Sequence, residues 1–231
     1  MRRRPIFSSL RAALICVPAL LCCVFYVSAR AESYLDPQSL APTLIDPPYA
    51  ESSDEWKKDV EAILALQKRP YPKELAAAEQ EREMSPEMVA EEVNVSRKKN
   101  PTLFHLLDRV GDTSRAVTDG TKKYWKARRP YLADDRVKAL IPAHANPAYP
   151  SGHTCGAYSW AHALAAVFPE KRAAFMRRAE QIAQHRVLVG MHYPHDIEGG
   201  KTLALLIAGA LSQDEEFLDD LAAAKKEAKT K

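Results

Sequence analysis

Apolar residues recur at helical spacing along most of this chain, and no segment of any length alternates apolar and polar residues as a strand does. The segment Ser53-Asp54-Glu55 has the composition of a helix start. The apolar positions that follow it at roughly helical spacing are Trp56, Val60, Ile63, Leu64 and Leu66. Pro70 and Pro72 end this predicted helix.

Further helices are predicted before the middle of the chain. Residues 73–93 are rich in Ala and Glu, and Ser85-Pro86-Glu87 marks a second helix start inside them. An amphipathic segment runs from Pro101 through Val110, and residues 113–126 also have a helical pattern.

The second half of the chain has the strongest apolar pattern. Prolines and an asparagine mark residues 131–149 as a loop. An almost wholly apolar helix is then predicted from Ser151 to Phe168, a composition typical of a buried central helix. Two more helices are predicted over about 170–187 and 194–211.

These segments together predict an all-α protein, a single-domain helical bundle over residues 32–231. Residues 32–50 carry four prolines and little periodicity, which is typical of an extended arm on the surface. The apolar stretch before Leu211 is too short to cross a bilayer, so we expect no integral membrane segment in this domain.

The first 31 residues have the pattern of a secretory signal peptide. Three arginines at positions 2–4 precede an apolar stretch from Ala12 to Val27, and Ala29-Arg30-Ala31 offers a small-x-small cleavage pattern. The alternative is an uncleaved anchor helix, but the apolar run is short for a span of roughly 20 residues. We therefore expect cleavage after residue 31 and export to the periplasm or the medium.

Removal of the signal peptide changes the charge and the cysteine content. The whole chain has a formal charge of +3, but residues 1–31 hold five of its 33 basic residues and none of its 30 acidic ones. The remaining 28 basic and 30 acidic residues give −2, so composition offers no case for nucleic-acid binding. Three of the four cysteines also lie in the signal peptide, and Cys155 alone cannot form an intrachain disulfide.

Three cations are candidates for holding a phosphate group: Lys122, Arg129 and Arg186. Ammonium and guanidinium groups stabilise the charge on phosphate oxygens, and guanidinium does so with two parallel hydrogen bonds. Any one of these cations is also typical of a solvated surface. Spacing alone does not separate them from their neighbours Lys123, Lys126 and Arg128.

The tetrapeptide Pro150-Ser151-Gly152-His153 is more specific. Gly152 removes a side chain where the backbone must approach an anion, and Ser151 adds a hydroxyl group. Both stand at a predicted helix start, where unpaired N–H groups and the helix dipole favour an anion. The alternative is an ordinary serine cap followed by a structural histidine.

A histidine and a carboxylate four residues apart complete the candidate site. A histidine nucleophile must be neutral at its attacking nitrogen, and Asp196 can hold the other nitrogen of His192 by a hydrogen bond. His153 would then donate a proton to the leaving oxygen. His195, beside Asp196, is a rival for His192.

The histidines also suggest a metal site, but the pattern argues against one. The chain lacks a His-x-x-x-His pair with a neighbouring Glu, and no cysteine pair survives export. Lys and Arg near His192 would oppose a bound dication. We therefore expect no metal and no other cofactor.

These residues resemble the signature of the type 2 phosphatidic acid phosphatase superfamily, which includes the bacterial class A non-specific acid phosphatases and the vanadium haloperoxidases. The pattern Lys-x6-Arg-Pro begins at Lys122, Pro-Ser-Gly-His begins at Pro150, and Arg-x5-His-x3-Asp begins at Arg186. These spacings select Lys122, Arg129 and His192 over their neighbours. The segment Leu44-Ile45-Asp46-Pro47-Pro48 also resembles the N-terminal region of the secreted class A acid phosphatases.

The resemblance implies a metal-independent acid phosphatase that hydrolyses small phosphate monoesters through a phosphohistidine. It implies His192 as the nucleophile, Asp196 as the residue that orients it, and His153 as the general acid. The residues that it implies for phosphate binding are Lys122, Arg129, Ser151, Gly152 and Arg186. Members of the superfamily often form homo-oligomers, so a homo-oligomer is one state that the resemblance leaves open.

One position departs from the family pattern. His185 stands where the family usually has a serine before the arginine, and we expect it to support Arg186 without touching the substrate. Three other functions share the same motifs: a lipid-phosphate phosphatase, a vanadium-dependent haloperoxidase and a non-catalytic phosphate-binding protein. The intact His192, Asp196 and His153 argue against the last of these, because binding alone requires no nucleophile.

Overall fold

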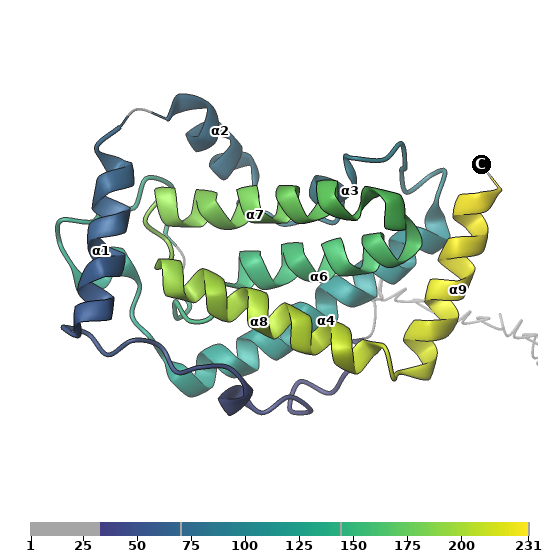
Figure 1. Cartoon of the computed structure of the whole chain (residues 1–231), viewed down its shortest axis with the longest axis horizontal. Coiled ribbons are helices and arrows are strands. Elements are labelled where there is room, and N and C mark those ends of the chain that lie inside the picture. The colour runs from purple at the N-terminus through teal and green to yellow at the C-terminus, as the bar shows by residue number, and fades with distance from the viewer. Residues whose placement is uncertain (1–32, 70, 144, 231) are drawn as a thin grey trace, which may run out of the picture. The chain divides into compact units, whose positions relative to one another are not determined.

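The computed structural model describes residues 33–69, 71–143 and 145–230 (Figure 1). The predicted signal peptide lies outside these residues. The regular elements of the described residues are all helical, and no strand occurs among them, which confirms the all-α fold. No helix in this part of the chain combines the length and the apolar character needed to cross a membrane.

The helices follow one another along the chain, and the longest connection between them covers residues 134–151, before α6. Their bounds are η1 (Pro42–Leu44), α1 (Asp54–Gln67), α2 (Pro72–Gln80), α3 (Glu87–Ala90), α4 (Pro101–Trp125), α5 (Pro130–Ala133), α6 (Gly152–Val167), η2 (Pro169–Lys171), α7 (Arg172–Leu188), α8 (Pro194–Leu211) and α9 (Glu215–Lys229).

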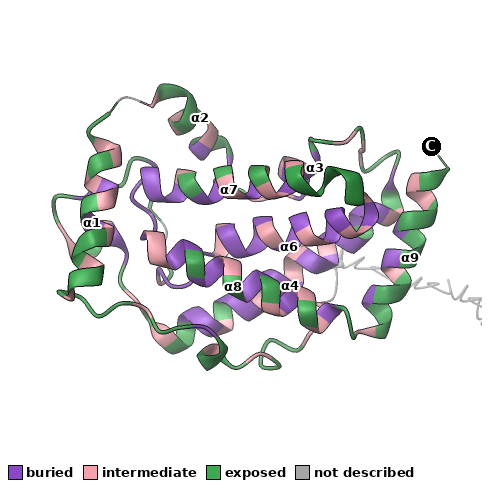
Figure 2. Ribbon diagram, in the orientation of Figure 1, coloured by how far each residue is buried: buried purple, intermediate pink, exposed green. Residues whose placement is uncertain are grey.

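Helix α6 lies at the centre of the bundle and packs against α4, α7 and α8 (Figure 1). Its almost wholly apolar sequence accounts for this position, because apolar residues on all sides of a helix need partners on all sides. Ala157 and Leu164 are completely buried, and the burial of α6 contrasts with the exposed outer face of α1 (Figure 2).

Most of the predicted helices are confirmed. Helix α1 begins where the sequence predicts, and the Ser53 hydroxyl caps it by accepting the Trp56 N–H at 3.1 Å. The segments predicted around residues 101–110 and 113–126 form one continuous helix, α4, whose buried face runs through both. The loop predicted at 131–149 begins later in the structure, because its first three residues belong to the short helix α5, which ends at Ala133.

Helix α9 is the element that the sequence reading missed. Its Lys- and Ala-rich end resembles a solvated tail, yet Phe217, Leu221 and Ala224 recur at helical spacing and are buried. The helix packs against α4 at the end of the bundle opposite α1 (Figure 1). The N-terminal arm is only partly extended: turns and bends occupy residues 34–40, η1 follows, and residues 46–50 have no regular structure. Ile45 is buried and anchors the arm in the core.

Candidate active site

The ends of four helices meet at the end of the bundle near α1 (Figure 1). The predicted site residues lie there: Lys122 in the last turn of α4, Arg129 before α5, Ser151, Gly152 and His153 at the start of α6, Arg186 in the last turn of α7, His192 in the following loop and Asp196 in the first turn of α8. Segments far apart in sequence therefore form one site.

Most of these side chains are buried although they are polar or charged. Lys122, Arg129, Ser151, Arg186, His192 and Asp196 are each at most 3% exposed. Burial of several charges is costly unless they are paired or serve a ligand. The concentration of cations at one place therefore indicates a site for an anion.

His192 lies between a carboxylate and a guanidinium group. Its Nδ1 is 3.1 Å from Oδ2 of Asp196, and its Nε2 is 2.7 Å from Nη1 of Arg129. A guanidinium group can only donate, so Nε2 must accept and Nδ1 must carry the proton given to Asp196. This is the tautomer that a nucleophilic Nε2 requires.

The surroundings keep His192 neutral. Burial, with further contributions from the charges of Arg129 and Lys122, lowers the pKa of His192 well below 6.5. Burial raises the pKa of Asp196, while the Tyr193 N–H and the two cations act in the opposite direction. The Tyr193 N–H bond, 3.0 Å long, also fixes the carboxylate of Asp196.

Asn146 holds Arg129 in place. Its backbone oxygen accepts from Nε of Arg129 at 3.0 Å, and its side-chain oxygen accepts from Nη2 at 2.5 Å. Nη1 also donates to the backbone oxygen of Met191 at 2.9 Å. Sequence reasoning placed Asn146 only in a loop, because no spacing rule links it to Arg129.

Lys122 is tied to the loop that leads into α6. Its Nζ donates to the backbone oxygens of Pro147 at 2.6 Å and Ala148 at 2.9 Å. Burial, with the nearby charge of Arg129, lowers the pKa of Lys122. A Cβ atom at Gly152 would lie 3.8 Å from Cε of Lys122, so the start of α6 and this lysine are neighbours.

Glu81 supports Arg186 and was not singled out from the sequence. The carboxylate is 1% exposed, and Oε2 contacts Nη2 of Arg186 at 3.3 Å and Nδ1 of His185 at 2.9 Å. Oε1 accepts from Arg178 at 2.9 Å. His185 thus reaches Arg186 through Glu81, which explains how a residue other than serine is accommodated there.

Arg186 has donors left for a ligand. Nη2 donates to the backbone oxygen of Ala78 at 2.6 Å, whereas the buried Nε and Nη1 have no hydrogen-bond partner among the described residues. Unsatisfied buried donors are costly, and an anionic oxygen would satisfy them. Arg186 therefore fits the phosphate-binding role that the family pattern implies.

His153 and Ser151 are both held at the start of α6. Nε2 of His153 lies 3.0 Å from the backbone oxygen of Glu81 and 3.3 Å from that of Arg82. Ser151 caps α6, since its hydroxyl oxygen accepts from the Thr154 N–H at 3.3 Å. The capping role does not exclude a contact of the hydroxyl group with phosphate, so the phosphate-binding role of Ser151 stays a prediction.

Glycines allow two close approaches that build the site. Gly190 has φ +72, and a Cβ atom there would lie 2.4 Å from the backbone oxygen of Lys138. The resulting tight turn lets the N–H of His192 donate to the Arg186 carbonyl at 3.2 Å. At Gly200 a Cβ atom would lie 2.7 Å from the backbone oxygen of Ser151. Because glycine has no Cβ atom, α8 can approach the start of α6.

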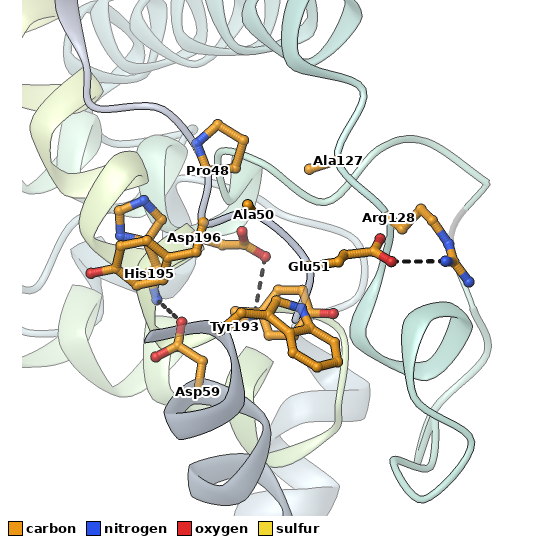
Figure 3. A pocket seen from close by; sticks show the side chains of 11 residues that line it. Pro48, Ala50, Glu51, Asp59, Ala127, Arg128, Tyr193, His195 and Asp196 are labelled. Carbon is orange, nitrogen blue, oxygen red and sulfur yellow. Dashed lines mark hydrogen bonds and ion pairs between the residues drawn. The ribbon is translucent and has the colours of Figure 1, made fainter. Parts of the chain in front are cut away.

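Two of the rival residues, His195 and Arg128, make contacts away from His192 and Arg129. His195 stacks on Tyr49 with ring centroids 3.8 Å apart, and its Nε2 contacts the Pro47 oxygen at 2.9 Å, so it holds the arm. Arg128 pairs with Glu51 at 2.9 Å on the surface. Both line a separate cavity of about 190 Å³ that reaches Asp196 from the side of the arm (Figure 3).

A cavity of about 230 Å³ opens beside the start of α6. Lys122, Asn146, Gly152 and His153 line it, whereas His192 does not. Within the described residues, no group of three or more His, Cys, Asp or Glu side chains is placed to hold a metal ion.

The fold and the site together define a class of protein. Its members are all-helical bundles with a buried histidine–carboxylate pair among fixed cations. Residues 113–218 match the family model of the PAP2 superfamily. This match agrees with the resemblance that the sequence motifs indicate, and all eight predicted site residues lie within the matched residues.

Two relatives and one solved structure illustrate the similarity. The chain is 28% identical over 138 residues to a non-specific acid phosphatase of Providencia stuartii, covering 58% of this chain and 56% of that one. It is 28% identical over 139 residues to an acid phosphatase of Zymomonas mobilis, covering 58% and 53%. The chain thus spans about half the length of each relative.

The solved structure is that of a bacterial vanadium-dependent iodoperoxidase. It aligns with a TM-score of 0.59 at 17% identity and covers 71% of this chain and 51% of that one. At this identity the likeness shows the fold alone.

Proposed function

We propose that this protein is a secreted phosphatase that hydrolyses phosphate monoesters through a phosphohistidine on His192. One observation carries the proposal: His192 is neutral and oriented. Its Nδ1 donates to Asp196, and its Nε2 accepts from Arg129, a cation that could also bind phosphate. A protein that only bound phosphate would need the cations but no oriented imidazole. The two acid phosphatases among its relatives support the same reaction.

In the first step the phosphate group binds to Lys122, Arg129 and Arg186, and Arg129 turns its Nη1 from His192 to a phosphate oxygen. Nε2 of His192 attacks phosphorus, and the bond from phosphorus to the leaving oxygen breaks. His153 gives a proton to that oxygen, so an alcohol departs. The Nδ1 proton stays with the His192–Asp196 pair, which stabilises the positive charge on the ring.

In the second step a water molecule attacks the phosphohistidine. His153, now without the transferred proton, takes one from the water. The bond between phosphorus and Nε2 breaks, and inorganic phosphate leaves with His192 restored. The cations stabilise the charge on the equatorial oxygens in both steps.

The test is hydrolysis of p-nitrophenyl phosphate by the purified protein in EDTA across pH 4 to 9. Activity that survives EDTA and disappears in His192→Ala supports the proposal. His195→Ala is the matched control, because this neighbouring histidine contacts the arm and not His192. Tight phosphate binding without turnover by the wild type would instead indicate a binding protein.

Export is a separate part of the proposal. It rests on the basic start, the apolar stretch and the small-x-small pattern at residues 29–31. Expression of the full chain in a Gram-negative host should yield a periplasmic protein whose first residue is Glu32. A full-length product that remains in the membrane fraction would contradict cleavage.

A further inference from the structure

The cavity beside α6 has two chemically different parts. Lys122, Asn146, Gly152 and His153 form one part, which belongs to the phosphate site. The other part consists of residues that none of the sequence motifs includes: the polar or charged Arg82, Glu83, Ser114, Arg115, Thr118 and Asp119, and the apolar Met84, Gly111, Gly156 and Trp160. The second part is therefore available for the rest of a substrate.

The chemistry of the proposed reaction places the leaving group on this side. The attacking and leaving atoms of a phosphoryl transfer lie roughly in line, on opposite sides of phosphorus. His192 does not line the cavity, whereas His153, the proton donor to the leaving oxygen, does. A leaving group that His153 protonates therefore extends into the cavity and away from His192.

The wall of this part offers a fixed aromatic ring. Trp160 is 4% exposed, and its Nε1 donates to the Leu107 oxygen at 2.8 Å. A Cβ atom at Gly111 would lie only 2.9 Å from Cζ2 of Trp160, so the glycine lets the ring lie directly against α4. A flat apolar group would find an apolar surface here.

Gly156 and Met84 set the width of the apolar part of the cavity. A Cβ atom at Gly156 would meet only Cε of Met84, at 3.7 Å, which is an ordinary contact. A side chain added there would extend toward Met84 and narrow the space without displacing the backbone. Met84 is partly buried, and its flexible side chain forms the facing boundary.

Size and charge limit the leaving group further. The cavity volume of about 230 Å³ is below the roughly 300–1,000 Å³ of pockets for drug-sized ligands. The other charged lining residues balance in sign, since two are cationic, Arg82 and Arg115, and two are anionic, Glu83 and Asp119. A second strong charge on the leaving group would therefore gain no net attraction.

We propose that Met84, Gly111, Gly156 and Trp160 form a leaving-group subsite that selects compact, uncharged leaving groups with a flat apolar face, such as aryl alcohols. The subsite rests on the proposed phosphatase function and adds its substrate class. It places specificity in side chains outside the phosphate-binding motifs.

The test compares phenyl phosphate with methyl phosphate in the full-chain protein carrying Gly156→Val. The added isopropyl group, about three carbon atoms in size, should raise the KM of phenyl phosphate by at least about tenfold. The KM of methyl phosphate and the Ki of inorganic phosphate should stay unchanged, because these ligands need only the phosphate site. Gly209→Val is the matched control, since a Cβ atom at this exposed glycine would meet nothing within 4 Å.

A second variant keeps the proposal testable if valine at position 156 prevents folding. Met84→Ala should widen the subsite and therefore lower the KM of naphthyl phosphate relative to that of phenyl phosphate. Equal effects on all esters, or no effect of either variant, would overturn the subsite while leaving the phosphatase intact. A wild-type protein that hydrolyses no ester would contradict the proposed function itself.

Discussion

Oε2 of Glu81 lies 3.3 Å from Nη2 of Arg186, and both side chains are almost completely buried. The backbone oxygen of the same glutamate lies 3.0 Å from Nε2 of His153. One residue at the end of α2 thus positions a phosphate-binding cation with its side chain and the proposed proton donor with its backbone.

The first prediction concerns Glu81→Gln. Although burial raises the pKa of Glu81, the hydrogen bonds and charges of His185 and Arg178 lower it below 4.5. Removal of this charge leaves Arg186 buried without its partner, which should reduce the free energy of unfolding by about 3 kcal/mol at pH 7. Denaturant unfolding would measure the loss.

The loss in Glu81→Gln should also depend on pH. A carboxyl group with a lowered pKa stabilises the fold above its unfolded pKa, and this contribution disappears as the pH falls through the folded pKa. The difference from wild type should therefore shrink below pH 4.5. The control is Glu83→Gln, at an exposed position. It should change the free energy of unfolding by less than about 0.5 kcal/mol, and a larger change would mean that the loss in Glu81→Gln is not specific to the buried pair.

The second prediction concerns His153→Gln and the leaving group. Nitrophenolate departs without a proton, whereas an alkoxide needs one. The variant should therefore lower kcat/KM, which reports the first step, by roughly 10²–10⁴-fold for an alkyl phosphate and much less for p-nitrophenyl phosphate. The second step, in which His153 takes a proton from water, is common to both esters. Equal losses for the two esters would mean that His153 does not act as the general acid.

The third prediction concerns the acid side of the pH profile. Because burial and Arg129 lower the pKa of His192 well below 6.5, its nucleophilic nitrogen stays unprotonated at mildly acidic pH. The value of kcat/KM, which reports the unliganded protein, should therefore persist below pH 6.5. The contradicting result would be a fall in kcat/KM on the acid side with a midpoint at pH 6.5 that is the same in His153→Gln. It would mean that the pKa of His192 is not lowered.

The fourth prediction concerns Lys122 on the alkaline side. Burial lowers its pKa below 10.5, so the lysine loses its charge at a lower pH than an exposed one. At pH 6, Lys122→Met should weaken the binding of inorganic phosphate by roughly tenfold or more. The ratio of variant to wild-type Ki should fall as the pH rises, since only the wild type has a charge to lose. The ratio cancels the ionisation of phosphate, and a constant ratio from pH 6 to 9 would contradict the lowered pKa.

Sequence periodicity predicted the bundle because its helices bury one face, as α1 and α8 do, or most of their surface, as α6 does. It missed α9, where three buried apolar positions stand among charged residues. The motifs gave the spacing of His192, Asp196 and Arg186, since short-range geometry fixes these contacts. Glu81 and Asn146 were not predictable, because their contacts with Arg186 and Arg129 depend on how distant segments pack.

The most direct test of the account is to identify the phosphorylated residue during turnover. Wild-type protein mixed with p-nitrophenyl phosphate and quenched in alkali, which preserves phosphohistidine, should carry one phosphoryl group on the peptide that contains His192. The His192→Ala variant should carry none and should be inactive. A phosphoryl group on another residue, or undiminished turnover by His192→Ala, would contradict His192 as the nucleophile.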